Sequence, residues 1–310
     1  MVKSRLNKGS LDPYSLNLYI YPMQWLNLIR WQNLTVMIYM MLMAGWVLHI
    51  HFSLNYIFLI CCVIVTAAAG NIWNDLNDQL ADNINKPEKV YIEVFIPKIH
   101  ALLAFWILNG VAVFFSLILF FQSYPFVLVI TLIAQILLFL YSLLFKRVVI
   151  LGNLIISILA WMSFLLLILY AKDAGGINQK WVMHLGLLAF FTTWIREAVK
   201  DMQDAPGDRE ANYRTLSVVW PLIYSKIYIF LLIALYIGYV MYFALSNNWL
   251  TFFPARLIPY LLVLLIPPVL IVWRIIVAEN PYDYKKTGNM IKIWMVIGIS
   301  STMLWKGIVF

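Results

Sequence analysis

The sequence predicts an all-α integral membrane protein with nine transmembrane helices. Its 310 residues are 64% hydrophobic and only 12% charged, against about 25% charged residues in soluble domains. The mean hydropathy is +0.85, the uncharged runs are long enough to span a membrane, and the basic residues fall largely on one side of those runs. These observations exclude a soluble enzyme, a disordered protein and a disulfide-stapled secreted domain.

The uncharged runs give the number of spans, because a helix needs about 20 mostly apolar residues to cross the hydrocarbon. The 44 uncharged residues between Arg30 and Asp75 fit two helices with a turn at 49–55. The 47 uncharged residues between Lys98 and Lys146 fit two more helices, which turn at 122–125. One helix each is expected for the runs at 148–171, 181–195, 227–255, 257–273 and 293–305.

The basic residues predict the orientation of the spans. If successive loops alternate sides, 18 of the 22 Lys and Arg residues lie on the side of the N-terminus. The positive-inside rule then places the N-terminus in the cytoplasm and the C-terminus outside. We expect a polar tail at 1–23, followed by one nine-helix domain at 24–310 in the cell (inner) membrane. The net charge of +8 belongs to this topology and does not indicate nucleic-acid binding.

The acidic residues are concentrated in two segments. Of the 14 Asp and Glu residues, five lie in 75–93 and five in 197–210, both expected at the cytoplasmic side. On a helix, residues at i, i+3 and i+7 fall within about 60° of one another. This spacing is followed by Asp75, Asp78 and Asp82 and, 126 residues later, by Asp201, Asp204 and Asp208. Because proline lacks the N–H that a helix needs, Pro206 is expected to end or distort the second helix, with Asp208 just past its end.

Two acidic stripes of this kind predict a magnesium site. Three carboxylates on one helical face repel one another, and this costs stability unless a cation lies among them. Oxygen ligands without Cys or His suit Mg²⁺, which commonly binds through one or two carboxylates and substrate phosphates. We expect all six aspartates to be catalytic metal ligands that hold two or more Mg²⁺ around a diphosphate. The alternative, a pair of solvated loop faces, is disfavoured because the same spacing occurs twice.

Basic and polar residues accompany the acids and could contact the diphosphate, to which Arg offers a planar fork of N–H donors. The alternative is that they cap helices or fix the topology. These candidates for diphosphate binding are Arg30, Asn71, Asn74, Lys86, Lys146, Arg147 and Arg209. Lys200, inside the second acidic segment, and Tyr141, five residues before Lys146, are further candidates for the catalytic centre. The ring face of Tyr141 could stabilise a carbocation.

The chain resembles the UbiA superfamily of intramembrane prenyltransferases. The first matching block is Asn74-Asp75-x-x-Asp78-x-x-x-Asp82, followed by Asn85-Lys86-Pro87. The second block is Arg196-Glu197-x-x-Lys200-Asp201-x-x-Asp204-x-x-x-Asp208-Arg209, and Tyr141-Ser142-x-x-x-Lys146-Arg147 lies between the two. The resemblance implies helices around a central cavity open to the cytoplasmic side, two Mg²⁺-binding motifs and an isoprenyl diphosphate donor. Within the family the blocks look most like the digeranylgeranylglyceryl phosphate synthase branch.

The expected function is therefore Mg²⁺-dependent transfer of a prenyl group from an isoprenyl diphosphate. The expected donor is geranylgeranyl diphosphate. The leading acceptor is a membrane-associated alcohol that resembles geranylgeranylglyceryl phosphate. Residues 211–217 depart from the Gly and Lys-Thr-Leu-Pro segment usual in that branch, so an aromatic acceptor stays open, either a hydroxybenzoate or a dihydroxynaphthoate. An acid-lined ion carrier is the more distant alternative. The sequence indicates no protein partner.

Overall fold

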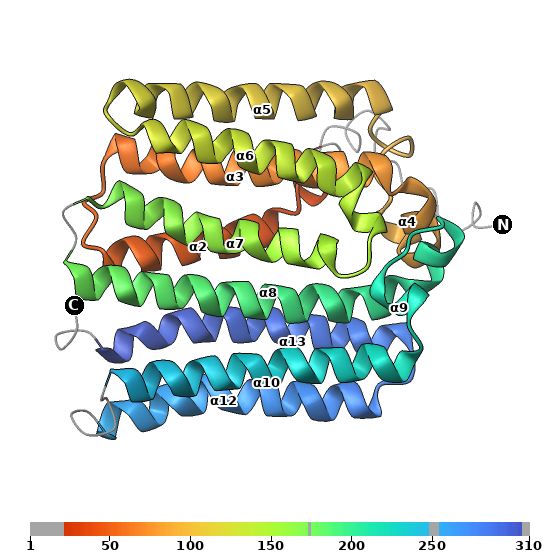
Figure 1. The fold of residues 1–310 in the computed structure, drawn as a ribbon. Coiled ribbons are helices and arrows are strands. Elements are labelled where there is room, and N and C mark those ends of the chain that lie inside the picture. The colour runs from red at the N-terminus through yellow and green to blue at the C-terminus, as the bar shows by residue number, and fades with distance from the viewer. Residues whose placement is uncertain (1–21, 173–174, 248–253, 306–310) are drawn as a thin grey trace, which may run out of the picture.

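In the computed structural model, which describes residues 22–172, 175–247 and 254–305, the protein is a bundle of long helices lying side by side (Figure 1). These described residues contain no β-strand, only an isolated bridge between Ile92 and Ile96. The predicted all-α class is confirmed. The long helices are α2 (Trp31–Val47), α3 (Leu54–Asn77), α5 (Lys98–Phe121), α6 (Pro125–Leu143), α7 (Leu151–Tyr170), α8 (Gly176–Glu210), α10 (Leu222–Ser246), α12 (Pro254–Val277) and α13 (Pro281–Ser300).

Six of these helices are long and apolar enough to cross a membrane, so the chain is an integral membrane protein. They are α3, α5, α6, α7, α10 and the 257–277 part of α12. Helices α2, α8 and α13 lie in the same bundle (Figure 1). However, α2 has only 17 residues, and α8 and α13 carry several charged residues, in 196–210 and 283–292. The count of nine spans stays a prediction.

The predicted turns within the two long uncharged runs are confirmed. Helix α2 ends at Val47 and α3 begins at Leu54, where the Ser53 side chain accepts a hydrogen bond from the Tyr56 N–H and caps the helix. Helix α5 ends at Phe121 and α6 begins at Pro125, since proline at the first helical position gives up no intrahelical bond. Helix α10 begins earlier than expected, at Leu222, and ends at Ser246.

The outer helices keep apolar side chains on the bundle's exterior. On α5, Ile99, Trp106, Ile107 and Phe114 are all more than half exposed, as expected for a helix in contact with lipid, which is as apolar as these side chains. Small residues allow close packing inside. A Cβ on Gly70 of α3, for example, would lie 2.9 Å from the Leu138 side chain of α6.

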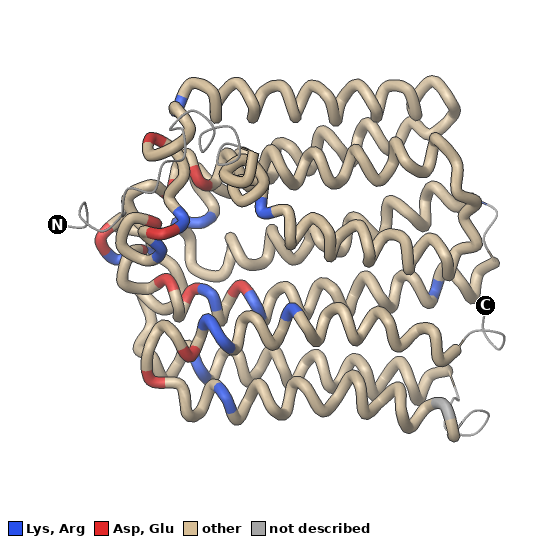
Figure 2. Tube along the Cα trace, turned by 180° about the vertical axis from the view of Figure 1, so that it is seen from behind, with Lys and Arg blue, Asp and Glu red and all other residues tan. Residues whose placement is uncertain are grey.

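Charged residues gather at one end of the bundle (Figure 2). Four short elements lie at this end. They are α4 (Gln79–Asn85), η1 (Pro87–Lys89), η2 (Phe145–Arg147) and α9 (Leu216–Val219), whereas η3 (Ser301–Trp305) follows α13. We call this end the polar end.

Helix α8 continues through Pro206 to Glu210, so the prediction that Asp208 lies past its end is wrong. Asn85 of α4 bonds the α8 backbone on both sides of the proline. Its Nδ2 donates to the Asp204 carbonyl at 2.8 Å, and its Oδ1 accepts from the Gly207 N–H at 2.8 Å. These two bonds offset the hydrogen bond that proline removes. A Cβ on Gly207 would lie only 2.4 Å from the Ala81 carbonyl oxygen, so α4 packs directly on α8.

Candidate active site

The two acidic stripes meet at the polar end because α4 packs against α8. Asp75 lies in the last turn of α3, Asp78 joins α3 to α4, and Asp82 lies in α4. The second stripe occupies the last turns of α8. The carboxylates point into the protein: Asp78 is 1% exposed, Asp204 8% and Asp208 2%. Burying charges in this way is costly unless each is matched by a partner.

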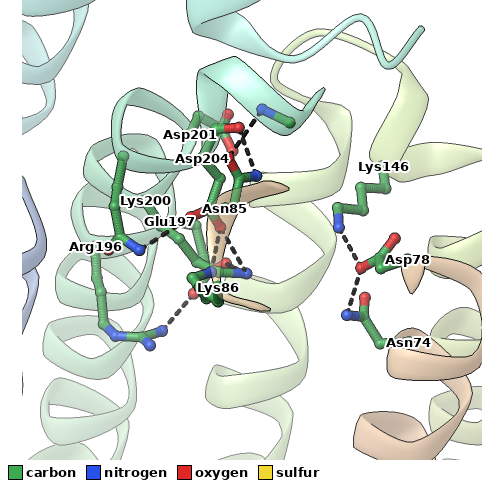
Figure 3. A network of polar contacts seen from close by, with 12 residues as sticks. Asn74, Asp78, Asn85, Lys86, Lys146, Arg196, Glu197, Lys200, Asp201 and Asp204 are labelled. Atoms are coloured by element: carbon green, nitrogen blue, oxygen red, sulfur yellow. Dashed lines mark hydrogen bonds and ion pairs between the residues drawn. The ribbon is translucent and has the colours of Figure 1, made fainter. Parts of the chain in front are cut away.

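Partners from other elements match four of the six aspartates, as Figure 3 shows for several of them. Each contact joins two elements of the bundle, which fixes the stripes relative to one another. The contacts are Arg30 Nη2 to Asp75 Oδ1 at 2.6 Å, Lys86 Nζ to Asp204 Oδ2 at 2.7 Å, Asn153 Nδ2 to Asp201 Oδ2 at 2.9 Å, and an ion pair between Lys146 and Asp78.

Asp78 is the most completely bonded of the carboxylates. Besides its pair with Lys146, it accepts from Asn74 Nδ2 at 2.6 Å and from the Tyr213 hydroxyl at 3.2 Å. The Tyr213 ring lies under two cations, 5.3 Å from Lys146 Nζ and 5.5 Å from the Arg147 guanidinium carbon. Burial, followed by the charge of Asp78, raises the pKa of Tyr213 to about 12, so the phenol keeps its proton and donates.

A second polar group lies one turn further into α8. Lys200 Nζ is 3.9 Å from Glu197 Oε2 and 4.0 Å from Asp204 Oδ2. Arg196 also pairs with Glu197. Figure 3 shows this group around Asp204 on one side and the group of Lys146, Asp78 and Asn74 on the other. The site therefore has acidic and basic side chains on both of its walls.

The donor set fits a divalent metal ion by its chemistry. Six carboxylates without Cys or His are the oxygen ligands that Mg²⁺ prefers. Burial, followed by the neighbouring charges of Asp78 and Asp75, raises the pKa of Asp82, so a cation beside it would stabilise its charged form. Among the described residues, no three acidic, His or Cys side chains already converge on one metal position. Three of the six aspartates, Asp75, Asp204 and Asp78, pair instead with Arg30, Lys86 and Lys146.

Two cavities adjoin at the polar end. An apolar chamber of about 300 Å³ lies between α2, α3, α6, α7, α8 and α13, and along α3 its lining extends from Asn74 to Cys62, about 18 Å at 1.5 Å per residue. Its inner wall is apolar, with Met37, Ala67 and Leu138 among its lining residues. A polar vestibule of about 360 Å³ lies outside it. Both cavities are lined by Arg30, Asn33, Arg196, Lys200 and Lys292.

Most of the predicted site residues lie around these cavities. The chamber mouth is lined by Arg30, Asn71, Asn74, Tyr141 and Lys200. Asp75, Asp82 and Lys86 line the vestibule. The Asn71 amide also donates to the Ile29 carbonyl at 2.9 Å, which is the capping role that the sequence left open.

The other predicted residues line neither described cavity. The contacts described above hold Asp78, Asp201, Asp204 and Lys146, whereas Asp208 is buried in α8. Two predicted arginines are exposed. Arg147 lies over the Tyr213 ring, and Arg209 lies in the last turn of α8. The structure does not bring Arg209 to the site.

Sequence reasoning missed three polar residues of this region. Asn153 and Tyr213 bind aspartates from segments without an acidic motif, and Lys292 lies on the last long helix. One signal could have found Lys292, because Lys285, Asn289 and Lys292 follow the i, i+4, i+7 spacing of one helical face. The Tyr213 contact had no such signal.

Comparison with known proteins decides the family. The model of the UbiA prenyltransferase family matches residues 33–296. This chain belongs to the UbiA prenyltransferase family. It is similar to digeranylgeranylglyceryl phosphate synthase of Methanococcus aeolicus, with 30% identity over 83% of this chain and 87% of the relative. The synthase of Methanospirillum hungatei JF-1 is 30% identical over 66% of this chain and 70% of the relative.

Solved structures share the UbiA fold. One, from work on the biosynthesis of digeranylgeranylglyceryl phosphate synthase in membranes, matches with a TM-score of 0.62 and 23% identity over 90% of this chain and 96% of that one. A UbiA homologue from Archaeoglobus fulgidus bound to GPP and Mg²⁺ also has a TM-score of 0.62, with 14% identity over 90% of this chain and 99% of that one. This UbiA family member is a prenyltransferase, and among curated proteins it is similar to the digeranylgeranylglyceryl phosphate synthases.

Proposed function

We propose that this UbiA prenyltransferase transfers a geranylgeranyl group from its diphosphate to the hydroxyl of a geranylgeranylglyceryl phosphate-like alcohol, with Mg²⁺ as cofactor. One observation carries the proposal: an apolar chamber ends at a mouth lined by Arg30, Arg196 and Lys200, where α3 and α8 continue into the two acidic stripes. This arrangement suits a ligand with a long apolar tail and an anionic head. The names of the similar curated proteins support the choice of acceptor.

The aspartates are proposed to hold the metal. Asp75, Asp78 and Asp82 would do so from one wall, and Asp201, Asp204 and Asp208 would do so from the other. Bound Mg²⁺ would neutralise the diphosphate and make it a better leaving group. Arg30, Lys86, Lys146 and Lys200 each pair with one of these carboxylates. We propose that these cations also bind the diphosphate oxygens, which carry the charge that develops as the bond breaks.

The transfer forms a carbocation, so water must be excluded from the site where it forms. The bond between C1 of the prenyl group and its diphosphate oxygen breaks, and both electrons stay with the diphosphate. The acceptor hydroxyl oxygen forms the new bond to C1, and its proton passes to an oxygen of the released diphosphate. The apolar wall of the chamber keeps water from the cation. Tyr141 lines the chamber mouth, and we propose that its ring face stabilises the positive charge.

We also propose the membrane topology. Helices α2, α8 and α13 would complete nine spans with the six that meet the criterion of length and composition. The polar end holds most of the charged residues (Figure 2). By the positive-inside rule this end, and with it the vestibule, faces the cytoplasm. The N-terminus would then be cytoplasmic and the C-terminus outside.

A direct assay tests the proposal. The purified chain in detergent receives Mg²⁺, labelled geranylgeranyl diphosphate and a panel of acceptors, and products are identified by mass spectrometry. The panel holds geranylgeranylglyceryl phosphate, a hydroxybenzoate and a dihydroxynaphthoate. We expect an ether product from the glyceryl phosphate alone. Product from an aromatic acceptor only would overturn the acceptor assignment, and no product from any acceptor would overturn the proposed function.

A further inference from the structure

One face of α13 presents a polar stripe to the vestibule. Lys285, Asn289 and Lys292 follow the i, i+4, i+7 spacing of one helical face, and all three line the vestibule. Lys292 also lines the mouth of the chamber, so it lies where the two cavities join. This stripe lies on a different helix from both acidic motifs, and the proposed diphosphate site does not use it.

Lys292 differs from the other half-buried cations of the site in its partner. Its Nζ donates to the Asn33 side-chain oxygen at 3.0 Å, which joins α13 to α2. Within residues 22–172, 175–247 and 254–305, no carboxylate forms an ion pair with Lys292. Arg30, Lys86 and Lys200, by contrast, each pair with a carboxylate. A half-buried ammonium with only a neutral amide partner retains most of its capacity to bind an anion.

The vestibule as a whole has a surplus of positive charge. Among the described residues, seven basic and only two acidic side chains line it. The basic side chains are Arg30, Lys86, Lys89, Arg196, Lys200, Lys285 and Lys292, and the acidic ones are Asp75 and Asp82. Since Arg30, Lys86 and Lys200 belong to the proposed diphosphate site, Lys292 is left for a second anion. Lys285 Nζ lies 4.0 Å from Glu88 Oε1, a long pair between two exposed side chains that a phosphate can replace.

We propose that Lys292, together with Lys285 and Asn289, binds a phosphate ester carried by the acceptor. This inference rests on the proposed function and deepens it, because it assigns the acceptor to the phosphate-bearing isoprenoid alcohols. Two ammonium groups and an amide offer enough donors for the three outer oxygens of a phosphate monoester, which carries about −1.5 to −2 charge at pH 7. A benzoate or naphthoate offers two oxygens and a single charge, and would leave part of this stripe unmatched.

The position of Lys292 also fits an acceptor that must present its hydroxyl to the chamber. A phosphate held at the junction of the two cavities keeps the polar end of the acceptor in the vestibule. The rest of the molecule can then reach the chamber mouth, where C1 of the donor is proposed to lie. Two anionic groups, the diphosphate and the phosphate, would thus be held by different side chains of one cationic vestibule.

The test separates acceptor binding from donor binding. Lys292→Met and Lys285→Met are compared with Lys286→Met, a matched control on the same helix. Lys286 is exposed, lies 4.4 Å from the Tyr282 ring centroid, and does not line the vestibule. The KM for geranylgeranylglyceryl phosphate, for the same alcohol without its phosphate and for geranylgeranyl diphosphate is measured in each variant. Titration of each acceptor without donor gives a binding constant that does not need turnover.

We expect Lys292→Met to raise KM and Kd for the phosphate-bearing acceptor by about tenfold or more, as the loss of a charge-assisted hydrogen bond predicts. The KM for the donor should change by less than about twofold, and so should all constants of Lys286→Met. Lys292→Arg, which keeps the positive charge, should bind the phosphate-bearing acceptor more tightly than Lys292→Met does. The alcohol without phosphate should bind wild type as weakly as it binds Lys292→Met.

Three results would overturn the inference: equal binding of both alcohols to wild type, a parallel rise in the KM of donor and acceptor, or an unchanged acceptor Kd in Lys292→Met. If Lys292→Met does not fold, the same KM and Kd measurements on Lys285→Met test the inference. If wild type transfers to no acceptor but binds the phosphate-bearing one through Lys292, the proposed function fails and the anion site stands.

Discussion

Lys86, which follows the first acidic motif, forms an ion pair with Asp204, the central carboxylate of the second motif. Lys86 Nζ lies 2.7 Å from Asp204 Oδ2, across 118 residues of sequence. Burial, then the neighbouring charge of Lys200, lowers the pKa of Lys86, so Asp204 supplies the charge that keeps this buried ammonium favourable. The two motifs are therefore one electrostatic unit, and a change in either should affect the other.

Removing one member of this pair should destabilise the protein more than removing both. Asp204→Asn leaves Lys86 buried without its carboxylate, and breaking such a pair costs about 3–5 kcal/mol. Lys86→Met with Asp204→Asn removes both charges and should recover much of that loss. Thermal unfolding in detergent measures the effect. Additive losses in the double variant would show that the pair does not couple the motifs.

Asp78 should matter to turnover as well as to folding. We expect Asp78→Asn to lower prenyl transfer by about a hundredfold or more, as the loss of a preorganised charge at a reacting centre does, while the protein still inserts and purifies. Glu279→Gln is the matched control, because Glu279 is an exposed carboxylate on the loop before α13. Turnover is measured with saturating Mg²⁺ and donor. Normal turnover of Asp78→Asn would remove the metal-ligand assignment.

The contact between α4 and α8 depends on a residue without a side chain. A Cβ at Gly207 would lie 2.4 Å from the Ala81 carbonyl oxygen and 2.5 Å from Asn85 Nδ2, so α4 must move. We expect Gly207→Ala to cost about 1–3 kcal/mol and to lower turnover, because α4 carries Asp82. Gly238→Ala on α10 is the control, since its Cβ would meet no atom within 4 Å. Equal melting temperatures for the two variants would show that α4 adjusts freely.

The sequence predicts the helices well because charge is costly in hydrocarbon. The lengths of two uncharged runs predicted two helices in each, and the polar residues and the proline within the runs placed the turns between α2 and α3 and between α5 and α6. The continuation of α8 past Pro206 could not be predicted. The sequence reveals that proline lacks an N–H, but it does not reveal that the Asn85 side chain bonds the α8 backbone beside the proline. Local spacing reveals features of one helix, whereas this compensation depends on a contact between two.

The same limit applies to the candidate site. The i, i+3, i+7 spacing predicted two groups of carboxylates, which the packing of α4 on α8 brings to one end of the bundle, and Asp75, Asp82 and Lys86 are among the predicted residues that line the vestibule. The partners that match those carboxylates lie far away in sequence, such as Tyr213, which is 135 residues from Asp78. Lys292 meets Asn33 across 259 residues. Such pairings follow from the packing of the bundle, which the periodicity of a single helix does not contain.

The chamber should limit the length of the donor's prenyl chain. Ala134 of α6 lines the chamber seven residues, or about 10 Å along the helix, from Tyr141 at its mouth. Ala134→Phe should fill this middle section, so turnover with geranylgeranyl diphosphate should fall by about tenfold or more. Turnover with the shorter geranyl diphosphate should change less, because its tail ends nearer the mouth. Leu132→Phe, at an exposed position of the same helix, is the control and should alter neither rate. Equal losses with both donors in Ala134→Phe would show that the prenyl tail does not occupy this chamber.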